Sequence, residues 1–437
     1  MSRNIAISPD PACDPDLATI HFSIQNFHLF YYLNDMESLL EQLLQRWEQA
    51  FDNLETLPGH KAQVKTTLYS DGSRYNLEKF DGKLFPSDGP LAKDKEGISP
   101  IGLHEYGFNA QGLPCYTTSR HDYNQITWEG FYTYSDTHAE YIDFCLNTGV
   151  PSDLKRMEFQ EGRKVSFQSI VINGRGSGYS LSQMSKEEVI SLIRNDGFSI
   201  IATVTRYEYG LTDKIEKSSS IHITPGIGKF TSYDEYTYDK NQTLDTIRTF
   251  FEQGTDRLTY CRVPENMSPE SLVESLAEEM AGLIAETLAD QHLTQPIALL
   301  ELSYHYADNY IPLLVCQSAQ EVAEKLANEE FTFIPDYYDD ALQVETKPIE
   351  HLFARLEEMM EEKDDMKLGR KMLRKAAALL TRSKLFGKMK VTDDFAAYAI
   401  DWSIEGHSDA HFEEILLECG VEAGTIKIWK QKGILPE

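Results

Sequence analysis

Between residues 62 and 180 the chain is divided into short segments by turn-forming residues, and this spacing restricts the fold more than any other feature. The segments alternate apolar or aromatic residues with polar ones, as in ITWEGFYTYSD and KRMEFQEGRKVSFQSIVING. Alternation with a period of two is typical of β-strands with one buried face. The breaks are residues that favour tight turns, namely Asp71–Gly72, Asp81–Gly82, Asn109–Gly112 and Glu161–Gly162. The sequence therefore predicts an antiparallel β-meander.

Helices are expected beside and within this meander. Residues 35–54 place Leu39, Leu43 and Trp47 on one apolar stripe, which predicts an amphipathic helix before the first strand. A short helix is expected at His138–Leu146. The Ser-x-x-Glu pattern at Ser185–Glu188 is a capping box that predicts another helix start. A further helix at Asp245–Gln253 is expected to close this part of the chain.

The sequence pattern changes at Pro264–Pro269 from mainly strand-like to mainly helical, which favours a domain boundary there. We expect a β-rich antiparallel-sheet domain with an N-terminal helix over residues 1–265, and a smaller, acidic, helix-rich domain over residues 266–437. Both parts mix helices and strands, so the predicted fold class is α+β. The elements expected in the second part are a helix from Ser268 to Asp290, a strand at Pro296–Tyr306, a helix opened by a capping box at Ser318–Glu321, one long helix or two over residues 349–380 with a break at Gly369, a strand at Phe395–Ile404, and short helices at 409–418 and 423–431.

Charge is segregated along the second part. The acidic segment, residues 266–350, holds seventeen Asp or Glu against Lys325 and Lys347, a balance of −15. This is about half of the net charge of −29. The basic strip, residues 366–390, follows with nine Lys or Arg and no acid. The strip can either neutralise the acidic segment or face solvent, and the two alternatives are equally open. Such patterning bears on partners rather than on chemistry.

No feature of the sequence indicates secretion or a membrane. No run of eighteen apolar residues occurs, and the start, MSRNIAISPDPACDPDL, lacks the apolar core of a signal peptide. The six cysteines are far apart, with no spacing that could hold zinc, and are expected to be buried small hydrophobes. We therefore expect a cytoplasmic protein.

Signatures of catalysis are weak. No GxSxG and no Walker motif occurs, and the glycine-rich stretch Gly174–Gly178 has Tyr179 where the third glycine of a dinucleotide loop would fall. His407 and His411 are four residues apart and could share a metal, but Ser408 stands where a zincin has Glu. The preferred interpretation is a protein without catalytic residues, metal or cofactor, and a metal-dependent enzyme remains an alternative.

A loop rich in acids and tyrosines, FTFIPDYYDD, is the candidate partner-binding site. Its proposed residues are Asp336, Tyr337, Tyr338, Asp339 and Asp340. Tyrosine supplies rigid contact area and aspartate supplies charge, a combination suited to a basic protein partner. The same carboxylates could instead hold Mg²⁺ if other ligands were supplied from elsewhere.

The final stretch, residues 413–435, resembles a helix-turn-helix. Ile426 and Trp429 would lie on its inner face, and Lys427, Lys430 and Lys432 on its outer face. Together with the basic strip this predicts nucleic-acid binding as an alternative function. Repulsion by the net charge of −29 makes that alternative weaker than protein binding.

Two stretches resemble uncharacterised bacterial proteins of the polymorphic-toxin immunity type. They are HEYGFNAQGLPCY with TWEGFYTYSDTHAEYIDFCL, and TDDFAAYAIDWSIEG with WKQKGIL. The resemblance implies an immunity protein that neutralises a toxin, and it implies no individual site residues. With the acidic segment, it predicts a non-enzymatic protein that binds a basic protein partner, with no nucleic acid and no membrane.

Overall fold

The computed structural model describes residues 36, 38–52, 58–72, 77, 91–98, 103–121, 126–146, 149–172, 185–195, 200–224, 228–289, 291, 295–304, 310–328, 341–363, 365, 367–383, 390–401 and 412–435. The chain forms two compact units, one of Met1–Tyr236 with Thr249–Asp256 and the other of Thr237–Arg248 with Arg257–Glu437. The predicted α+β class is confirmed, and the division into separate domains at residue 265 stays a prediction.

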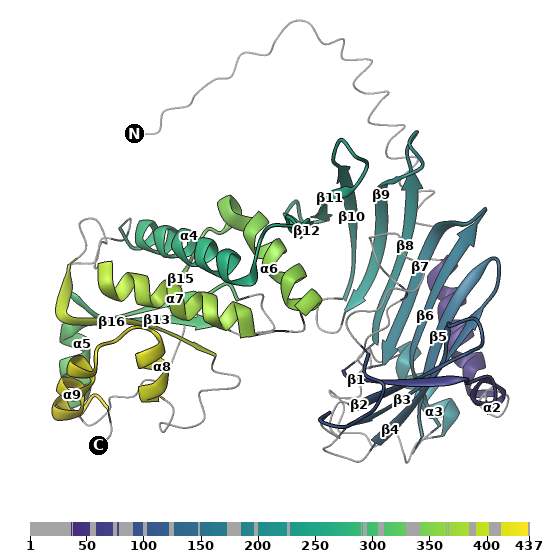
Figure 1. The fold of residues 1–437 in the computed structure, drawn as a ribbon, viewed down its shortest axis with the longest axis horizontal. Coiled ribbons are helices and arrows are strands. Elements are labelled where there is room, and N and C mark those ends of the chain that lie inside the picture. The colour runs from purple at the N-terminus through teal and green to yellow at the C-terminus, as the bar shows by residue number, and fades with distance from the viewer. Residues whose placement is uncertain are drawn as a thin grey trace, which may run out of the picture. The chain divides into compact units, whose positions relative to one another are not determined.

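Twelve strands of the described chain form one sheet in which each strand lies next to its neighbour in sequence (Figure 1). This order is that of a meander, as the turn spacing predicted. The strands are β1 Thr66–Asp71, β2 Leu103–Phe108, β3 Pro114–His121, β4 Ile126–Tyr134, β5 His138–Cys145, β6 Pro151–Gln160, β7 Arg163–Ile172, β8 Ile200–Tyr209, β9 Ile215–Thr224, β10 Gly228–Tyr238, β11 Leu244–Phe251 and β12 Asp256–Cys261. The turn between β6 and β7 uses Glu161 and Gly162 with φ of 51° and 79°, a left-handed geometry that suits a tight hairpin.

The expected helix at His138–Leu146 is wrong, because these residues form strand β5. They pair antiparallel with β4 on one side and with β6 on the other. Ile142 and Phe144, two residues apart, are both buried in the core that contains Trp47. Pairing on both edges therefore decides the conformation of a segment whose local composition is ambiguous.

The expected helix at Asp245–Gln253 is also wrong, because β11 occupies most of it. The turn before β11 is built by Asp239, whose Oδ1 accepts hydrogen bonds from the backbone N–H groups of Asn241 (2.8 Å) and Thr243 (2.9 Å). Gln242 in this turn has a φ of 62°. An aspartate that satisfies its own turn in this way returns the chain as a hairpin rather than starting a helix.

A helix over residues 38–52 covers one face of the long sheet, as the apolar stripe predicted. Leu43 and Trp47 are buried against strand residues such as Phe144. The indole Nε1–H of Trp47 donates to the carbonyl of Pro151 at 3.0 Å, so the buried polar group of this ring is satisfied. Helix α3, Lys186–Asn195, begins at the predicted capping box, with Ser185 Oγ accepting from the N–H of Glu188 at 3.2 Å.

The second unit contains a four-stranded sheet of the order β15-β14-β13-β16. Strand β13 pairs antiparallel with β14 and parallel with β16. Figure 1 shows α4 and α7 on one side of this sheet and α5, α8 and α9 on the other. The elements are α2 Pro58–Lys61 in the first unit, and α4 Pro269–Ala289, β13 Ile297–Tyr304, β14 Leu313–Ser318, α5 Ala319–Ala327, β15 Leu342–Gln343, η6 Lys347–Ile349, α6 Glu350–Lys363, α7 Lys367–Ser383, β16 Val391–Asp401, α8 Phe412–Glu418 and α9 Ala423–Lys432 in the second.

The edge strand β16 has side chains bonded to its outer backbone groups. The N–H of Ala397 donates to Thr381 Oγ1 at 2.9 Å, and this hydroxyl donates to the carbonyl of Ala397 at 3.2 Å. The N–H of Ala399 donates to the sulfur of Cys419 at 3.4 Å. Helix α7 and the residue that follows α8 thus supply the partners that a further strand would otherwise supply.

The predicted break at Gly369 is wrong, although two helices are present. Helix α6 ends at Lys363 and α7 begins at Lys367, so Gly369 lies inside the first turn of α7. Glycine is needed there for close packing rather than for a break, because a Cβ at this position would lie 2.3 Å from Cδ2 of Tyr310.

Candidate functional site

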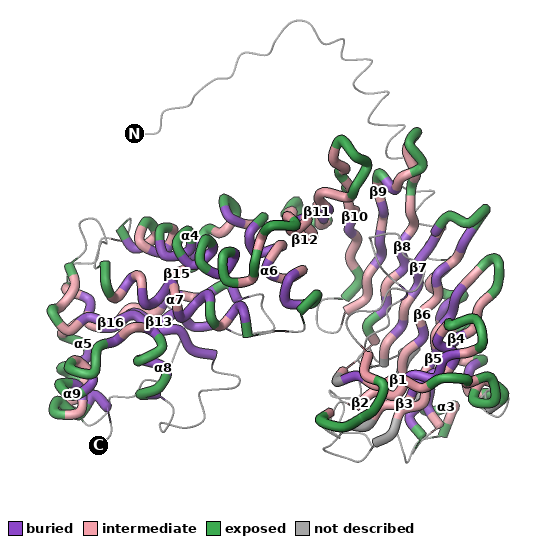
Figure 2. The backbone as a smooth tube through the Cα atoms, viewed as in Figure 1, coloured by how far each residue is buried: buried purple, intermediate pink, exposed green. Residues whose placement is uncertain are grey.

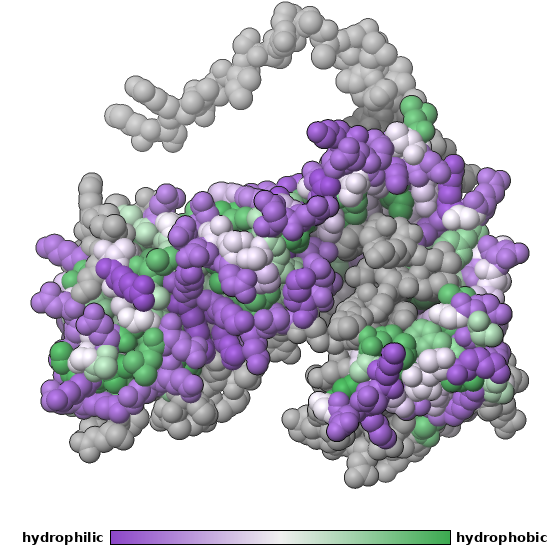
Figure 3. Space-filling model, in the orientation of Figure 1, coloured by the Kyte–Doolittle hydropathy of each residue, from purple (hydrophilic) through white to green (hydrophobic). Residues whose placement is uncertain are grey.

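The outward side of α4 is a strongly acidic surface of the second unit. Helix α4 buries Leu272, Leu276 and Met280 in the core, and its opposite side is exposed, as the alternating colours along it in Figure 2 show. Five glutamates and no base lie on the exposed side of α4, and we call them the acidic face: Glu270, Glu274, Glu278, Glu279 and Glu286. Figure 3 shows hydrophilic side chains over the region of α4, α6 and α7, interrupted by apolar patches.

Helix α7, which carries most of the basic strip, packs beside α4. Its apolar side, including Leu373 and Ala377, is buried in the same core. Of its charged groups, Lys375 pairs with Glu274 at 2.7 Å. Arg374 instead pairs with Glu418 of α8, and Lys371 pairs with Asp365 at 3.2 Å. The two helices therefore lie side by side without full neutralisation.

The remaining carboxylates of the acidic face have no ion-pair partner in the described part of the chain. These carboxylates are Glu270, Glu278, Glu279 and Glu286. Lys371 and Arg374 of α7 pair with acids outside α4. For the described part of the basic strip, the structure combines the two alternatives left open: α7 packs along α4, and Lys375 pairs with one of the five carboxylates of the acidic face.

The closing helices α8 and α9 form the predicted helix-turn-helix shape. Gly420 in the turn has a φ of 76°, and Ile426 and Trp429 are buried on the inner side. The outer lysines are largely engaged, since Lys430 pairs with Glu413 and Lys432 with Asp394, each at 2.6 Å. A surface for phosphates would need those ammonium groups, so the geometry gives little support to the nucleic-acid alternative.

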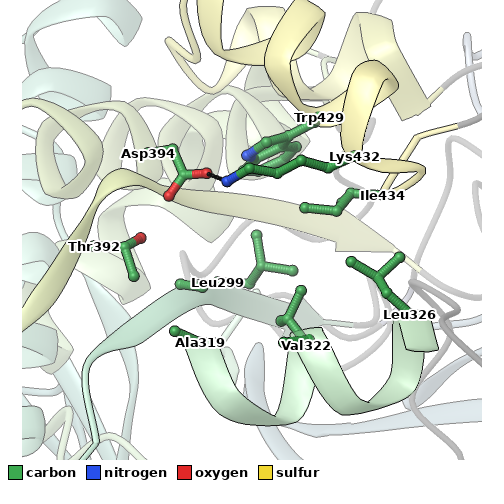
Figure 4. Close-up of a pocket in the computed structure, with 11 residues that line it drawn as sticks. Leu299, Ala319, Val322, Leu326, Thr392, Asp394, Trp429, Lys432 and Ile434 are labelled. Carbon is green, nitrogen blue, oxygen red and sulfur yellow. Dashed lines mark hydrogen bonds and ion pairs between the residues drawn. The ribbon is translucent and has the colours of Figure 1, made fainter. Parts of the chain in front are cut away.

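A cavity of about 240 Å³ lies between α5, β13, the start of β16 and α9 (Figure 4). Its walls are mostly apolar, and the ion pair of Asp394 with Lys432 lies along one side. Sequence patterning did not reveal it, because the residues that line it are spread from Ala298 to Ile434.

A polar cluster inside the long sheet was also missed. On β5, the Asp143 carboxylate accepts from the N–H of Asp153 (2.8 Å) and from the hydroxyl of Tyr141 (3.2 Å). Burial, with the charge of Asp153 nearby, raises the pKa of Asp143 to about 8. Lys155 pairs with Asp153 at 3.0 Å, yet burial still raises the pKa of Asp153. The signal in the sequence was an aspartate in the middle of an aromatic strand, which the helical interpretation of β5 hid.

Several predicted site residues lie outside the described residues. These are the loop Asp336, Tyr337, Tyr338, Asp339 and Asp340, the pair His407 and His411, and the stretch Gly174–Gly178. Across the described parts of the chain, no three His, Cys, Asp or Glu side chains come together as metal ligands. Among the described helices, none combines the length and apolar character needed to cross a membrane.

No known protein family matches the sequence, and no curated protein matches it. Among solved structures, the chain is similar to a porin-like protein from Bacteroides vulgatus ATCC 8482. That match has 8% sequence identity and a TM-score of 0.22, and it covers 37% of this chain and 80% of the other. A TM-score this low supports no inference about fold or function.

Proposed function

We propose that this protein is a non-enzymatic, cytoplasmic binding protein that uses an acidic surface to engage a basic protein. In the more specific form of the proposal, the partner is a basic toxin and the chain is its immunity protein. The observation that carries the proposal is the acidic face of α4, which has five exposed glutamates, while the helix contains no Lys or Arg.

Two further observations support this proposal. The basic helix α7 lies beside α4, yet only Lys375 among its described residues is placed to neutralise a carboxylate of the acidic face. The face is also built on a rigid element, because the inner side of α4 is fully packed through Leu272, Leu276 and Ile284. A fixed array of like charges attracts a partner of opposite sign over a range that salt shortens to about 10 Å at 0.1 M.

The test is a binding measurement on the full chain after a partner has been captured from the native host and purified. A variant with Glu270, Glu278, Glu279 and Glu286 all changed to Gln removes four charges from the acidic face. We expect its association rate at low salt to fall about tenfold or more, because steering by charge acts on the rate of encounter. The association rate of the unchanged protein should also fall as salt is added, because salt screens the same charges.

A matched control changes Glu187, Glu208, Glu216 and Glu235 to Gln, four exposed acids of the first unit. This variant has the same net charge as the first and should bind nearly as fast as the unchanged protein. An equal fall in the association rate of both variants would show that net charge, not the acidic face, guides binding. Failure to capture any stable protein partner would contradict the whole proposal, and growth rescue of cells that express the partner would test its immunity form.

A further inference from the structure

The cavity beside α9 has the walls of a small-molecule site. Leu299 of β13, Val322 and Leu326 of α5, and Ile434 after α9 form its apolar part, and Trp429 lies at one side (Figure 4). Trp429 is 1% exposed and Val322 is 5% exposed, so both side chains are held in place by the core. A pocket with fixed apolar walls can bind a ligand without first ordering its own residues.

The volume limits the size of the ligand. An apolar cavity of about 150 Å³ is enough for benzene. The present cavity, at about 240 Å³, therefore has room for one or two fused rings or a branched chain of similar bulk.

The charges in the cavity limit the ligand further. Asp394 and Lys432 are joined at 2.6 Å. Burial alone would raise the pKa of Asp394, but the hydrogen bond and the charge of Lys432 act against this effect and the pKa is lowered, so the carboxylate stays ionised and paired. The Lys432 side chain is 51% exposed and that of Asp394 24%, so the pair lies at the rim of the cavity and not among its apolar walls. A charged ligand whose body fills the cavity would place its own charge against those apolar walls, which is costly. An uncharged ligand could keep the pair intact and still form a hydrogen bond at that end.

We propose that this cavity binds a small, uncharged molecule with an apolar, ring-sized body and one polar end that faces the Asp394–Lys432 pair. The inference goes beyond protein binding by the acidic face, because α5 and α9 lie on the opposite side of the small sheet from α4 (Figure 1).

Indole is a suitable probe, since it is uncharged, apolar and has one N–H donor. The full chain labelled with 5-fluorotryptophan would be titrated with indole, and the fluorine signal of Trp429 would be identified by its loss in Trp429→Phe. We expect the Trp429 signal to shift with saturation while that of Trp47, in the first unit, does not move. The anion indole-3-acetate and the cation tryptamine should bind about tenfold more weakly, because each brings an unpaired charge.

Two variants test the location. Ala319→Phe places a ring inside the cavity and should abolish the shift, whereas Ala327→Phe, on an exposed position of the same helix outside the lining, should not. If Ala319→Phe does not fold, Ala323→Phe serves instead, because Ala323 lines the cavity and is exposed. The proposal is overturned if indole leaves the Trp429 signal unmoved up to its solubility limit. It is also overturned if a folded cavity-filling variant, Ala319→Phe or Ala323→Phe, binds indole as well as the unchanged protein does. Equal binding of the charged relatives would overturn the proposed ligand class.

Discussion

Gly369 lies against the ring of Tyr310 with no room for a side chain between them. A Cβ on Gly369 would come within 2.3 Å of Cδ2 and 2.4 Å of Cγ of that ring. Tyr310 is itself buried in the core of the second unit, in contact with Tyr304 at a centroid distance of 5.7 Å. The first turn of α7 is therefore positioned by a ring from the segment before β14.

Substituting Gly369→Ala should destabilise the protein although alanine is the better helix former. The gain in helix propensity is about 1 kcal/mol, whereas forcing a methyl group into a packed site costs about 1–3 kcal/mol and moves neighbouring groups. We expect a net loss in the free energy of unfolding, measured by urea titration with circular dichroism. Gly282→Ala is the control, because Gly282 is an exposed glycine inside α4 and a Cβ there would meet nothing within 4 Å. That variant should gain up to about 1 kcal/mol, and a gain in both would show that the contact with Tyr310 yields easily.

Asp143→Asn should change how stability depends on pH. In the folded protein the pKa of Asp143 is raised to about 8 from an ordinary value of 3.8, so between these values the folded chain holds a proton that the unfolded chain has lost. The free energy of unfolding therefore falls as the pH rises through this window and levels off above it. Asparagine cannot ionise, so the variant should exceed the wild type by on the order of 2 kcal/mol at about pH 9 and show less advantage at about pH 5. Parallel curves for the two proteins from urea titrations across this range would contradict the assignment.

Ser318→Ala should loosen the start of α5. Ser318 Oγ accepts from the N–H of Glu321 at 3.1 Å, and the Glu321 carboxylate accepts from the N–H of Ser318 at 2.6 Å, so the substitution removes one half of a reciprocal cap. The expected loss is about 1 kcal/mol, seen as faster amide hydrogen exchange in α5 by mass spectrometry. Ser275→Ala on the exposed side of α4 is the control and should leave exchange in α4 nearly unchanged. Unchanged exchange in α5 of the Ser318 variant would mean that packing alone holds this helix.

The ion pair between Lys375 and Glu274 should contribute little to stability. The two side chains are 39% and 57% exposed, and exposed pairs contribute about 0.2–1 kcal/mol. A double-mutant cycle with Lys375→Gln and Glu274→Gln should give a coupling energy in that range, and it should shrink as salt is added. A coupling above about 2 kcal/mol would indicate that α7 neutralises the acidic face more effectively than one exposed contact can.

The elements that the sequence predicted correctly are those specified by neighbouring residues. Each of these elements is specified by residues that are close together in the sequence. They are the capping boxes at Ser185 and Ser318, the apolar stripe around Trp47, and the turn at Glu161–Gly162. They appear in the structure where they were expected. The helix-turn-helix shape of α8 and α9 belongs to the same group.

Of the elements that the sequence failed to predict, β11 follows a local turn built by Asp239, and the others depend on contacts between distant segments. Residues His138–Cys145 become a strand because β4 and β6 pair with both edges. Gly369 is a point of close contact with the ring of Tyr310, a residue far from it in sequence, and not a helix break. The proton held near Asp143 depends first on burial in the sheet and then on the charge of Asp153, ten residues away across a strand pair, and a helix over β5 would not bring the two together. The cavity beside Trp429 likewise needs four segments to meet. The candidate loop at Asp336–Asp340 stays a prediction.

The parallel pairing of β13 with β16 has a consequence for the order of events during synthesis. Ile297 of β13 lies opposite Val391 of β16, and Tyr304 lies opposite Asp401. Because α6 and α7 lie between the two strands in the sequence, β16 leaves the ribosome only after both helices have been made. Until then, one edge of β13 has no strand to bind, although its hairpin with β14 can already form. A nascent chain stalled before residue 391 should therefore expose an unpaired edge of β13 that chaperones can bind. Release of the nascent chain from chaperones should coincide with the emergence of β16.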